Sequence, residues 1–438
     1  MVESRPVFRV AAHPFPTCTG GFGMRFSIRA LAALALFSSL GASAQDAPSI
    51  DGRFIEVTGT DVRSTYPILT LDWDGPASDE LRYYAKQDGT GRDYPATLRD
   101  GEFTFVPRGM LPGETYRFRV SAEPKHADYA PIVRIEKREN EDALDVFIED
   151  QLLTTYYYSN DNKKPFLWPI NSMRGISVTR DWPMKDDGDP KGPGKDHPHH
   201  KSMWIAYGDI NGEDMWDEGD KAGYQRSDEV TFGSGDAYGW IHAKNTWLGN
   251  DKQPVIAEER EYRFYATPER GRMIDQKVTL TASYGEAKFG DTKEGGLCAV
   301  RMRPELSGRN AHIVNAQGDE DEARAWGTPS PWCDYSGEIE GAGVLGLTIM
   351  DNPENFRFPS CWHVRSYGLM GANAFGYSYF RERKGNESLP ETGDYVLKEG
   401  DALTMNYRVY VHAGDVEKAD VKERYADYAN PPKAVWLP

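Results

Sequence analysis

Short segments in which apolar and polar residues alternate make up most of the chain, and this is the pattern of half-buried β-strands. In the clearest of them, every second residue from Leu403 to Val411 is apolar or aromatic, while Thr404 and Asn406 lie between them. Similar strand patterns occupy residues 143–150, 260–266, 273–283 and 343–351. Helical periodicity is convincing only in the tail, at residues 416–429. The pattern therefore predicts an all-β protein of antiparallel strands.

Turn signals divide the chain into a small and a large region. Between residues 45 and 122, Asp-Gly or Pro-Gly pairs recur at hairpin spacing, at 74–75, 88–89, 100–101 and 112–113. We expect a small immunoglobulin-like β-sandwich here, followed by a polar linker over 123–131. The remaining strand pattern, residues 132–438, predicts a large antiparallel β-supersandwich whose two big sheets pack face to face and carry the catalytic site.

The first 44 residues have the features of an upstream extension and a signal peptide. Arg25 and Arg29 precede a short apolar run over residues 30–40, and Ala42-Ser43-Ala44 forms a small-residue cleavage site. The apolar run is too short to span a bilayer. We predict cleavage after Ala44, a mature start at Gln45, and a periplasmic or secreted protein with no membrane insertion in its mature form.

Charge and cysteine content exclude some partners. The formal net charge is −17, and removing residues 1–44, which hold four Arg and one Glu, makes it −20. Such an acidic protein is not expected to bind nucleic acid. An anionic substrate is still possible where basic side chains gather locally. The mature chain retains Cys298, Cys333 and Cys361, so at most one disulfide could form within it.

Four polar segments rich in aromatic residues interrupt the strand pattern. They read DHPHHKSMW (196–204), FGDTKEGG (289–296), WGTPSPWCDYSG (326–337) and CWHVRSYG (361–368). Grouped imidazoles, carboxylates and cations are costly to bury separately, because each needs a partner. We therefore expect the first, second and fourth segments to converge on one open cleft of a concave sheet face, beside at least one of their tryptophans.

These segments contain the side chains that acid–base work on a sugar requires. Imidazoles and carboxylates exchange protons near neutral pH, tryptophan rings stack on sugar rings, and arginine or lysine stabilises developing negative charge. The predicted catalytic residues are His199, His200, Asp291, Glu294 and His363. The predicted substrate-binding residues are His197 (oriented by Asp196), Lys201, Trp204, Lys293, Trp332, Tyr335, Trp362 and Arg365.

The same segments resemble a family of exported bacterial proteins that carries a PmoA-like, "methane oxygenase" label. The matching text includes DHPHHKSMWIAYGDINGEDMW, FGDTKEGGL, WGTPSPWCDYSG and NPENFRFPSCWHVRSYGLMGANAFG, and it extends roughly over residues 150–415. The resemblance implies a shared domain without an assigned reaction. Methane oxidation is excluded, because a membrane monooxygenase needs several transmembrane helices. The strand pattern is instead similar to the galactose-mutarotase-like supersandwich, a fold that many sugar enzymes use.

The function that follows is an exported carbohydrate-active enzyme whose substrate is a glycan or oligosaccharide. Hydrolysis of a glycosidic bond or lyase-type elimination is expected, without a cofactor. Two alternatives stay open. One is a metal-dependent hydrolase in which His197, His199 and His363 bind a divalent metal. The other is a non-catalytic glycan-binding protein that uses the same tryptophans.

Overall fold

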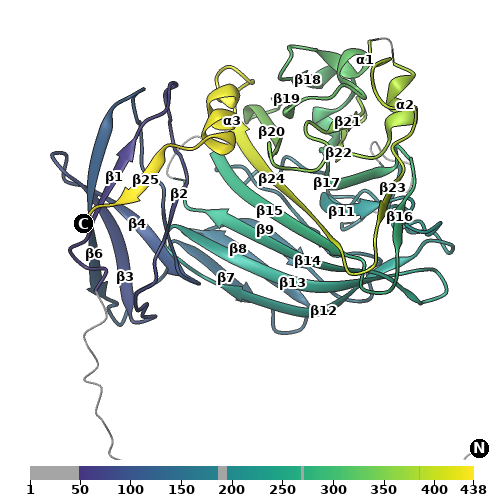
Figure 1. Ribbon diagram of the computed structural model, residues 1–438. Coiled ribbons are helices and arrows are strands. Elements are labelled where there is room, and N and C mark those ends of the chain that lie inside the picture. Colours follow the sequence, from purple (N-terminus) through teal and green to yellow (C-terminus); the bar gives the residue numbers. More distant parts are fainter. Residues whose placement is uncertain (1–48, 186–194, 268–270, 384) are drawn as a thin grey trace, which may run out of the picture. The chain divides into compact units, whose positions relative to one another are not determined.

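β-Strands are the predominant regular secondary structure of the protein, whose computed structural model describes residues 49–185, 195–267, 271–383 and 385–438. The chain is nearly all-β and contains several large antiparallel sheets, so the predicted fold class is confirmed (Figure 1). The predicted signal peptide and its cleavage site after Ala44 lie outside the described residues. The same holds for most of the charged loop that precedes Asp196.

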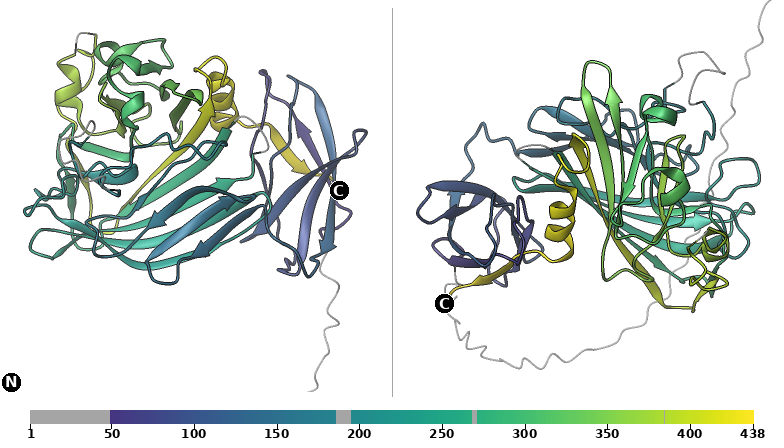
Figure 2. Two further views of the ribbon diagram at one scale, coloured as in Figure 1. Left: turned by 180° about the vertical axis from the view of Figure 1, so that it is seen from behind. Right: turned by 90° about the horizontal axis from the view of Figure 1, so that it is seen from above.

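The small region is one seven-stranded sheet. In order across the sheet, its strands are β2 (Leu69–Asp72), β5 (Glu102–Phe105), β4 (Arg92–Arg99), β3 (Leu81–Gln87), β6 (Thr115–Pro124), β1 (Phe54–Thr58) and β25 (Lys433–Trp436). Its two edges approach each other, because Trp436 Nε1 donates to the Asp72 carbonyl oxygen at 2.7 Å and the Trp436 ring lies 5.5 Å from that of Trp73. The sheet therefore curls around its own core, as the right-hand view of Figure 2 shows. The C-terminal strand, expected in the large region, belongs to this small sheet.

The large region consists of two eight-stranded antiparallel sheets. The strands of one, in order across it, are β21 (Cys361–Val364), β22 (Leu369–Asn373), β17 (Gly295–Arg301), β11 (Met203–Tyr207), β10 (Phe166–Leu167), β9 (Gln151–Tyr157), β8 (Ala143–Ile148) and β7 (Val133–Lys137). The strands of the other are β12 (Tyr224–Gly233), β13 (Tyr238–Leu248), β14 (Pro254–Tyr265), β15 (Gly271–Thr281), β24 (Ala402–Ala413), β20 (Gly343–Asp351), β19 (Trp332–Ile339) and β18 (His312–Asn315). We call them the site sheet and the long-strand sheet.

The main hydrophobic core lies between these two sheets. On β24 the predicted apolar face, from Leu403 to Val411, is buried in this core together with Ile205 of β11 and Leu297 of β17. Cys298, Cys333 and Cys361 are buried and free. No helix in the described part of the chain is both long and apolar enough to cross a membrane.

Helices are few and short, as the sequence predicts. They are α1 (Asp321–Ala325), α2 (Tyr377–Arg381), α3 (Val421–Ala429) and the 3₁₀ turns η1 (Pro304–Leu306) and η2 (Gly308–Asn310), and a two-stranded sheet pairs β16 (Ala287–Phe289) with β23 (Tyr395–Leu397). The longest, α3, falls inside the segment where helical periodicity was expected. Tyr428 of α3 lies under the Arg408 guanidinium of β24, so this helix covers the β24 face that points away from the core.

Candidate active site

One row of directly paired residues crosses six strands of the site sheet. Paired residues of neighbouring strands lie on the same face of a sheet. The row runs Tyr157, Phe166, Trp204, Ala299, Gly371 and His363. Ala299 and Gly371 are small, so no large side chain of the row fills the stretch between Trp204 and His363. Residues of two polar segments singled out in the sequence, Trp204 and His363, therefore lie on one face, the face opposite the main core, and the segment 289–296 ends in β17 between them.

The loop that carries the histidine cluster is held by two buried arginines. Arg180 donates to the carbonyl oxygens of Asp196 at 2.8 Å and His200 at 3.0 Å, and it also contacts the carbonyl of His197. Arg301 donates to Asp196 Oδ1 at 2.6 Å. Asp196 thus neutralises two buried guanidinium groups, which would otherwise be costly to bury. The loop backbone is fixed by the chain's own charges.

His200 lies at the bottom of this loop as a neutral imidazole. Its side chain is only 1% exposed, and Arg301 Nη1 lies 2.9 Å from its Nδ1. Because arginine can only donate, Nδ1 must accept, and the proton sits on Nε2. Burial, followed by the charges of His199 and Arg301, lowers the pKa of His200 well below its usual value. The predicted catalytic role of His200 is therefore corrected to a positioning role.

His197 occupies the exposed end of a stack of rings. Its ring is nearly parallel to those of Tyr367 and His200, with centroids 5.2 Å and 5.0 Å away, and His200 stacks in turn on Trp204. His197 Nδ1 lies 2.8 Å from Asp196 Oδ2, which is the predicted orienting contact. The side chain is 43% exposed, so its Nε2 edge is left available for proton exchange.

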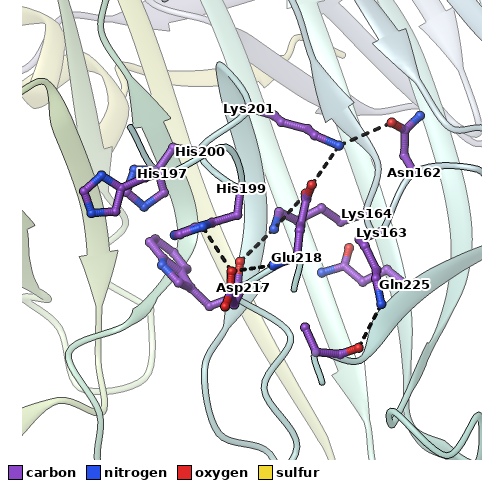
Figure 3. Close-up of polar contacts among 12 residues, drawn as sticks. Asn162, Lys163, Lys164, His197, His199, His200, Lys201, Asp217, Glu218 and Gln225 are labelled. Atoms are coloured by element: carbon purple, nitrogen blue, oxygen red, sulfur yellow. Dashed lines mark hydrogen bonds and ion pairs between the residues drawn. The ribbon is translucent and has the colours of Figure 1, made fainter. Parts of the chain in front are cut away.

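His199 points from the same loop toward a second polar cluster, shown in Figure 3. Its Nδ1 lies 3.2 Å from Asp217 Oδ1. Beyond Asp217, Glu218 pairs with two ammonium groups, Lys201 Nζ at 2.9 Å and Lys164 Nζ at 3.1 Å. Burial, followed by the charge of Lys164, lowers the pKa of His199 to about 4. At neutral pH this imidazole is uncharged.

Glu294 lies where three segments meet. Its carboxylate accepts a hydrogen bond from Lys293 Nζ at 2.9 Å, and its side chain is 43% exposed. Burial would raise the pKa of Glu294, but the charges of His363, Lys293 and His199 outweigh it and hold the pKa below its usual value. The structure thus brings Glu294 together with one histidine from each of the other two segments.

His363, in contrast, is almost wholly buried beneath this carboxylate. Burial lowers its pKa to about 4, although the charge of Glu294 acts in the opposite direction. Its Nδ1 has no hydrogen-bond partner among the described residues. His363 is therefore uncharged at neutral pH, and its protonation is coupled to the charge of Glu294.

The buried histidine should make stability depend on pH. The unfolded chain protonates His363 near pH 6.5 and the folded chain only near pH 4, so its contribution is complete above pH 6.5 and is lost as pH falls toward 4. We expect His363→Gln to reduce the loss of unfolding free energy between pH 7 and pH 5 by about 2 kcal/mol, measured by denaturant titration. Asp351, whose pKa is raised to about 6 by burial, acts in the opposite sense but is common to both proteins. An equal loss of unfolding free energy in the wild type and in His363→Gln would contradict the low pKa assigned to His363.

The other predicted carboxylate does not lie in this cluster. Asp291 accepts hydrogen bonds from the backbone amides of Ser378 at 3.0 Å and Gly393 at 2.7 Å. A carboxylate with these partners ties two loops together. Asp291 and Glu294 are therefore not a catalytic pair, and the predicted role of Asp291 is corrected to a structural one.

The predicted sugar platforms are mostly core residues. Alternation along β21 places Trp362 in the main core and His363 on the opposite face, and Trp362 Nε1 donates to the Ser330 carbonyl at 2.8 Å. Tyr335 is buried in the same core, and Trp332 belongs to a second core cluster. Trp204 lies on the site face but is fully buried beneath His200. None of these four rings can contact a substrate, so this part of the prediction is wrong.

The predicted cationic residues lie at the rim of the site. Arg365 Nε is 3.1 Å from Glu322 Oε1, and its guanidinium lies 5.8 Å from the Tyr367 ring. The charges of both Arg365 and Glu294 influence the pKa of Tyr367, which burial raises. Tyr367 stacks on His197, and the charge of Glu294 influences its pKa.

A cavity of about 660 Å³ opens next to the histidine loop. Its aromatic wall consists of Tyr157, Phe166 and Trp168, and the rings of Tyr157 and Phe166 are stacked with centroids 5.1 Å apart. Its polar lining includes Lys201, Glu218 and Asn162, and Pro198 of the histidine loop also borders it. The charge of Glu218, which lines this cavity, influences the pKa of His199, and the charge of His199 influences the pKa of Glu294.

The described residues do not form an evident metal centre. Within the ranges that the structure describes, no group of three or more His, Cys, Asp or Glu side chains is arranged to hold a metal ion. Asp196 occupies His197 Nδ1, and Asp217 occupies His199 Nδ1. The proposed ligand set of His197, His199 and His363 is therefore not assembled here.

Sequence reasoning missed several residues that build the site. No sequence motif around Arg180 or Arg301 indicates that either residue belongs to the site. Asp217 and Glu218 come directly after the conspicuous Trp216, so the acidic run WDEGD was a usable signal. Tyr157, Phe166 and Trp168 lie in an aromatic-rich stretch that reads equally well as core.

Comparisons with known proteins place the chain in a family. No curated protein matches its sequence. An α-mannosidase from Enterococcus faecalis V583 is similar in structure, with a TM-score of 0.39 and 8% identity over 89% of this chain and 46% of that chain, so this chain spans about half of its length. A GalM/aldose epimerase homologue from C. elegans gives a TM-score of 0.24 and 8% identity over 64% of this chain and 100% of that one. The sequence profile of a family of unknown function (DUF6807) matches residues 143–426, most of the chain, so the protein belongs to this family.

Proposed function

We propose that the protein is an exported carbohydrate-active enzyme that transfers protons on a glycan at the site around Glu294. One observation carries the proposal: the half-exposed Glu294 carboxylate is coupled to His199 and His363, which come from two distant segments. Polar groups assembled from separate segments around an accessible carboxylate are typical of catalytic sites. The PmoA-like resemblance stays a prediction, and methane oxidation is not proposed.

The protonation states support a division of roles. The pKa of Glu294 is below its usual value, so this carboxylate is ionised at neutral pH and suits a general base or a nucleophile. His197, oriented by Asp196 and half exposed, suits the partner that delivers or removes the second proton. Tyr367 stacks on the His197 ring. Hydrolysis and lyase-type elimination both need such a pair, and we propose one of these two reactions.

The aromatic cavity supports a sugar as the substrate. A sugar ring presents a C–H face that packs on aromatic rings, and hydroxyl groups that need both donors and acceptors. In the cavity beside Pro198, Trp168 and Tyr157 offer aromatic rings for the C–H face. The polar side chains of Lys201, Glu218 and Asn162 offer donors and acceptors for the hydroxyl groups. Its volume, about 660 Å³, suits a sugar residue or a short oligosaccharide.

Trp168→Ala is expected to weaken sugar binding about tenfold, because it removes the largest ring of this wall. The matched control is Trp240→Ala on β13, since Trp240 is also half-buried but contacts Arg99 and does not border the cavity. Binding would be measured by titration calorimetry with oligosaccharides that the wild type binds. Equal affinity in Trp168→Ala and the wild type would remove the cavity from the proposal.

The proposed reaction is tested by incubating the protein with a panel of polysaccharides and oligosaccharides. New reducing ends without ultraviolet-absorbing products indicate hydrolysis, and unsaturated products indicate elimination. Either result, abolished in Glu294→Gln, supports the proposal. Tight binding of a glycan with no turnover of any panel member would overturn it in favour of a non-catalytic glycan-binding protein.

A further inference from the structure

Arg272, near the start of β15, is a buried cation whose charge is not balanced. Arg272 is 5% exposed, and its Nη2 donates a long hydrogen bond to Gln151 Oε1 at 3.4 Å. Across the described ranges, no ion pair joins its guanidinium to a carboxylate. Two other buried arginines of this chain do have one: Arg260 pairs with Glu258, and Arg408 with Asp275.

An unpaired guanidinium in such a place carries a free-energy cost. Arginine keeps its charge at neutral pH, and a buried charge needs an opposite charge or several hydrogen bonds to offset its lost hydration. Burial lowers the pKa of Arg272, and Glu149 alone opposes this effect. Because arginine carries five N–H donors, most of its hydrogen-bonding capacity is available to a partner that is not part of the chain.

Arg272 lines a cavity of about 460 Å³. The wall is partly apolar, with Ile132, Ile148 and Val106, and two more arginines, Arg92 and Arg108, also border it. A cavity of this volume, lined by both apolar and charged residues, is typical of a site for a small organic ligand. The buried Arg272 guanidinium sets the sign of the charge that would fit.

The carboxylates of the cavity wall do not supply the missing partner. Asp236 pairs with Arg82 at 3.0 Å and accepts from the Ile132 amide, and Asp93 lies 3.4 Å from Lys86 Nζ. Both acids are therefore balanced by cations that do not border the cavity. Glu149 is the remaining carboxylate of the cavity wall, and its side chain is exposed to solvent. Arg272 is thus a buried cation of the wall that has no carboxylate partner among the described residues.

We propose that this cavity binds a small organic anion whose carboxylate, sulfate or phosphate group pairs with Arg272 while its body packs on the apolar wall. A planar guanidinium matches the geometry of such oxyanions and can bind them through two parallel hydrogen bonds. The site lies apart from the candidate active site, and the inference does not depend on the proposed reaction.

The test is thermal unfolding of the full chain at constant ionic strength, with chloride, acetate, benzoate, sulfate or phosphate as the added anion. A ligand at about a hundred times its Kd should raise the Tm of the wild type by about 3 °C. A selective rise with benzoate or acetate identifies a carboxylate site, and a rise with sulfate or phosphate identifies a tetrahedral oxyanion. Chloride at the same ionic strength should give no rise.

Two variants of the site separate binding from a general salt effect. Arg272→Met should remove the rise in Tm, whereas Arg309→Met, which removes an exposed arginine elsewhere, should keep it. Gln151→Glu places a carboxylate where the amide oxygen now meets Arg272, so we expect a higher Tm without added anion and a smaller rise with it. No selective rise in the wild type, or the same rise in Gln151→Glu and the wild type, would overturn the proposal even if Arg272→Met did not fold.

Discussion

Glu294→Gln is expected to lower turnover of the glycan substrate by about 10²- to 10⁴-fold, the range that a positioned acid–base group contributes. The amide keeps the shape of the side chain and its contact with Lys293, but it can neither accept a proton nor attack carbon. Because His199 and His363 remain in place, the fold and substrate affinity should change little. The measurements are kcat and KM on a substrate found in the panel, together with the Tm.

Asp291→Asn is the matched comparison, since this acid lies in the same segment. Its carboxylate holds the backbone amides of Ser378 and Gly393, so its loss should lower the Tm rather than selectively remove turnover. If Asp291→Asn abolished turnover at an unchanged Tm while Glu294→Gln stayed active, the catalytic carboxylate would have been assigned to the wrong residue.

Glu258→Gln is expected to destabilise the protein by about 3–5 kcal/mol, the cost of breaking a buried ion pair from one side. The Glu258 and Arg260 side chains are both fully buried on β14, and the carboxylate also accepts from Trp247 Nε1 and Asn245 Nδ2. Neutralising Glu258 leaves the Arg260 charge without a carboxylate in the core. The change would be seen as a lower midpoint in denaturant titration.

The neighbouring Glu259 provides the control. Its side chain is 60% exposed and its nearest partner is His242 at 3.5 Å. Glu259→Gln should therefore change the free energy of unfolding by no more than about 0.5 kcal/mol. Similar effects of the two substitutions would contradict the burial that the structure assigns to them.

The strands and helix α3 could be predicted, because local patterns of apolar and polar residues indicate them directly. On β24, alternation from Leu403 to Val411 follows from the two-residue repeat of a strand, and those residues are the buried ones. The helical period of residues 416–429 likewise marks the place of α3. What each pattern leaves open is which other strand the segment pairs with.

The candidate site was predicted in part. Clustered polar residues have to satisfy one another, and this argument predicted that His199, Glu294 and His363 lie near one another. In the structure, the charges of both histidines influence the pKa of Glu294. The same argument could not separate Glu294 from Asp291, three residues away. The difference depends on which backbone amides lie nearby, and those of Ser378 and Gly393 come from distant segments.

The sequence by itself determined the all-β class, the positions of the strands and the segments that carry the chemistry, because these depend on residue type and spacing along the chain. Only the tertiary structure decided which face each residue occupies and what it meets there. Trp362 and His363 are adjacent in sequence, yet the pairing of β21 with β22 sends one into the core and the other to the site. Register also forms the row from Tyr157 to His363, and it does so through contacts between residues that are far apart in the sequence.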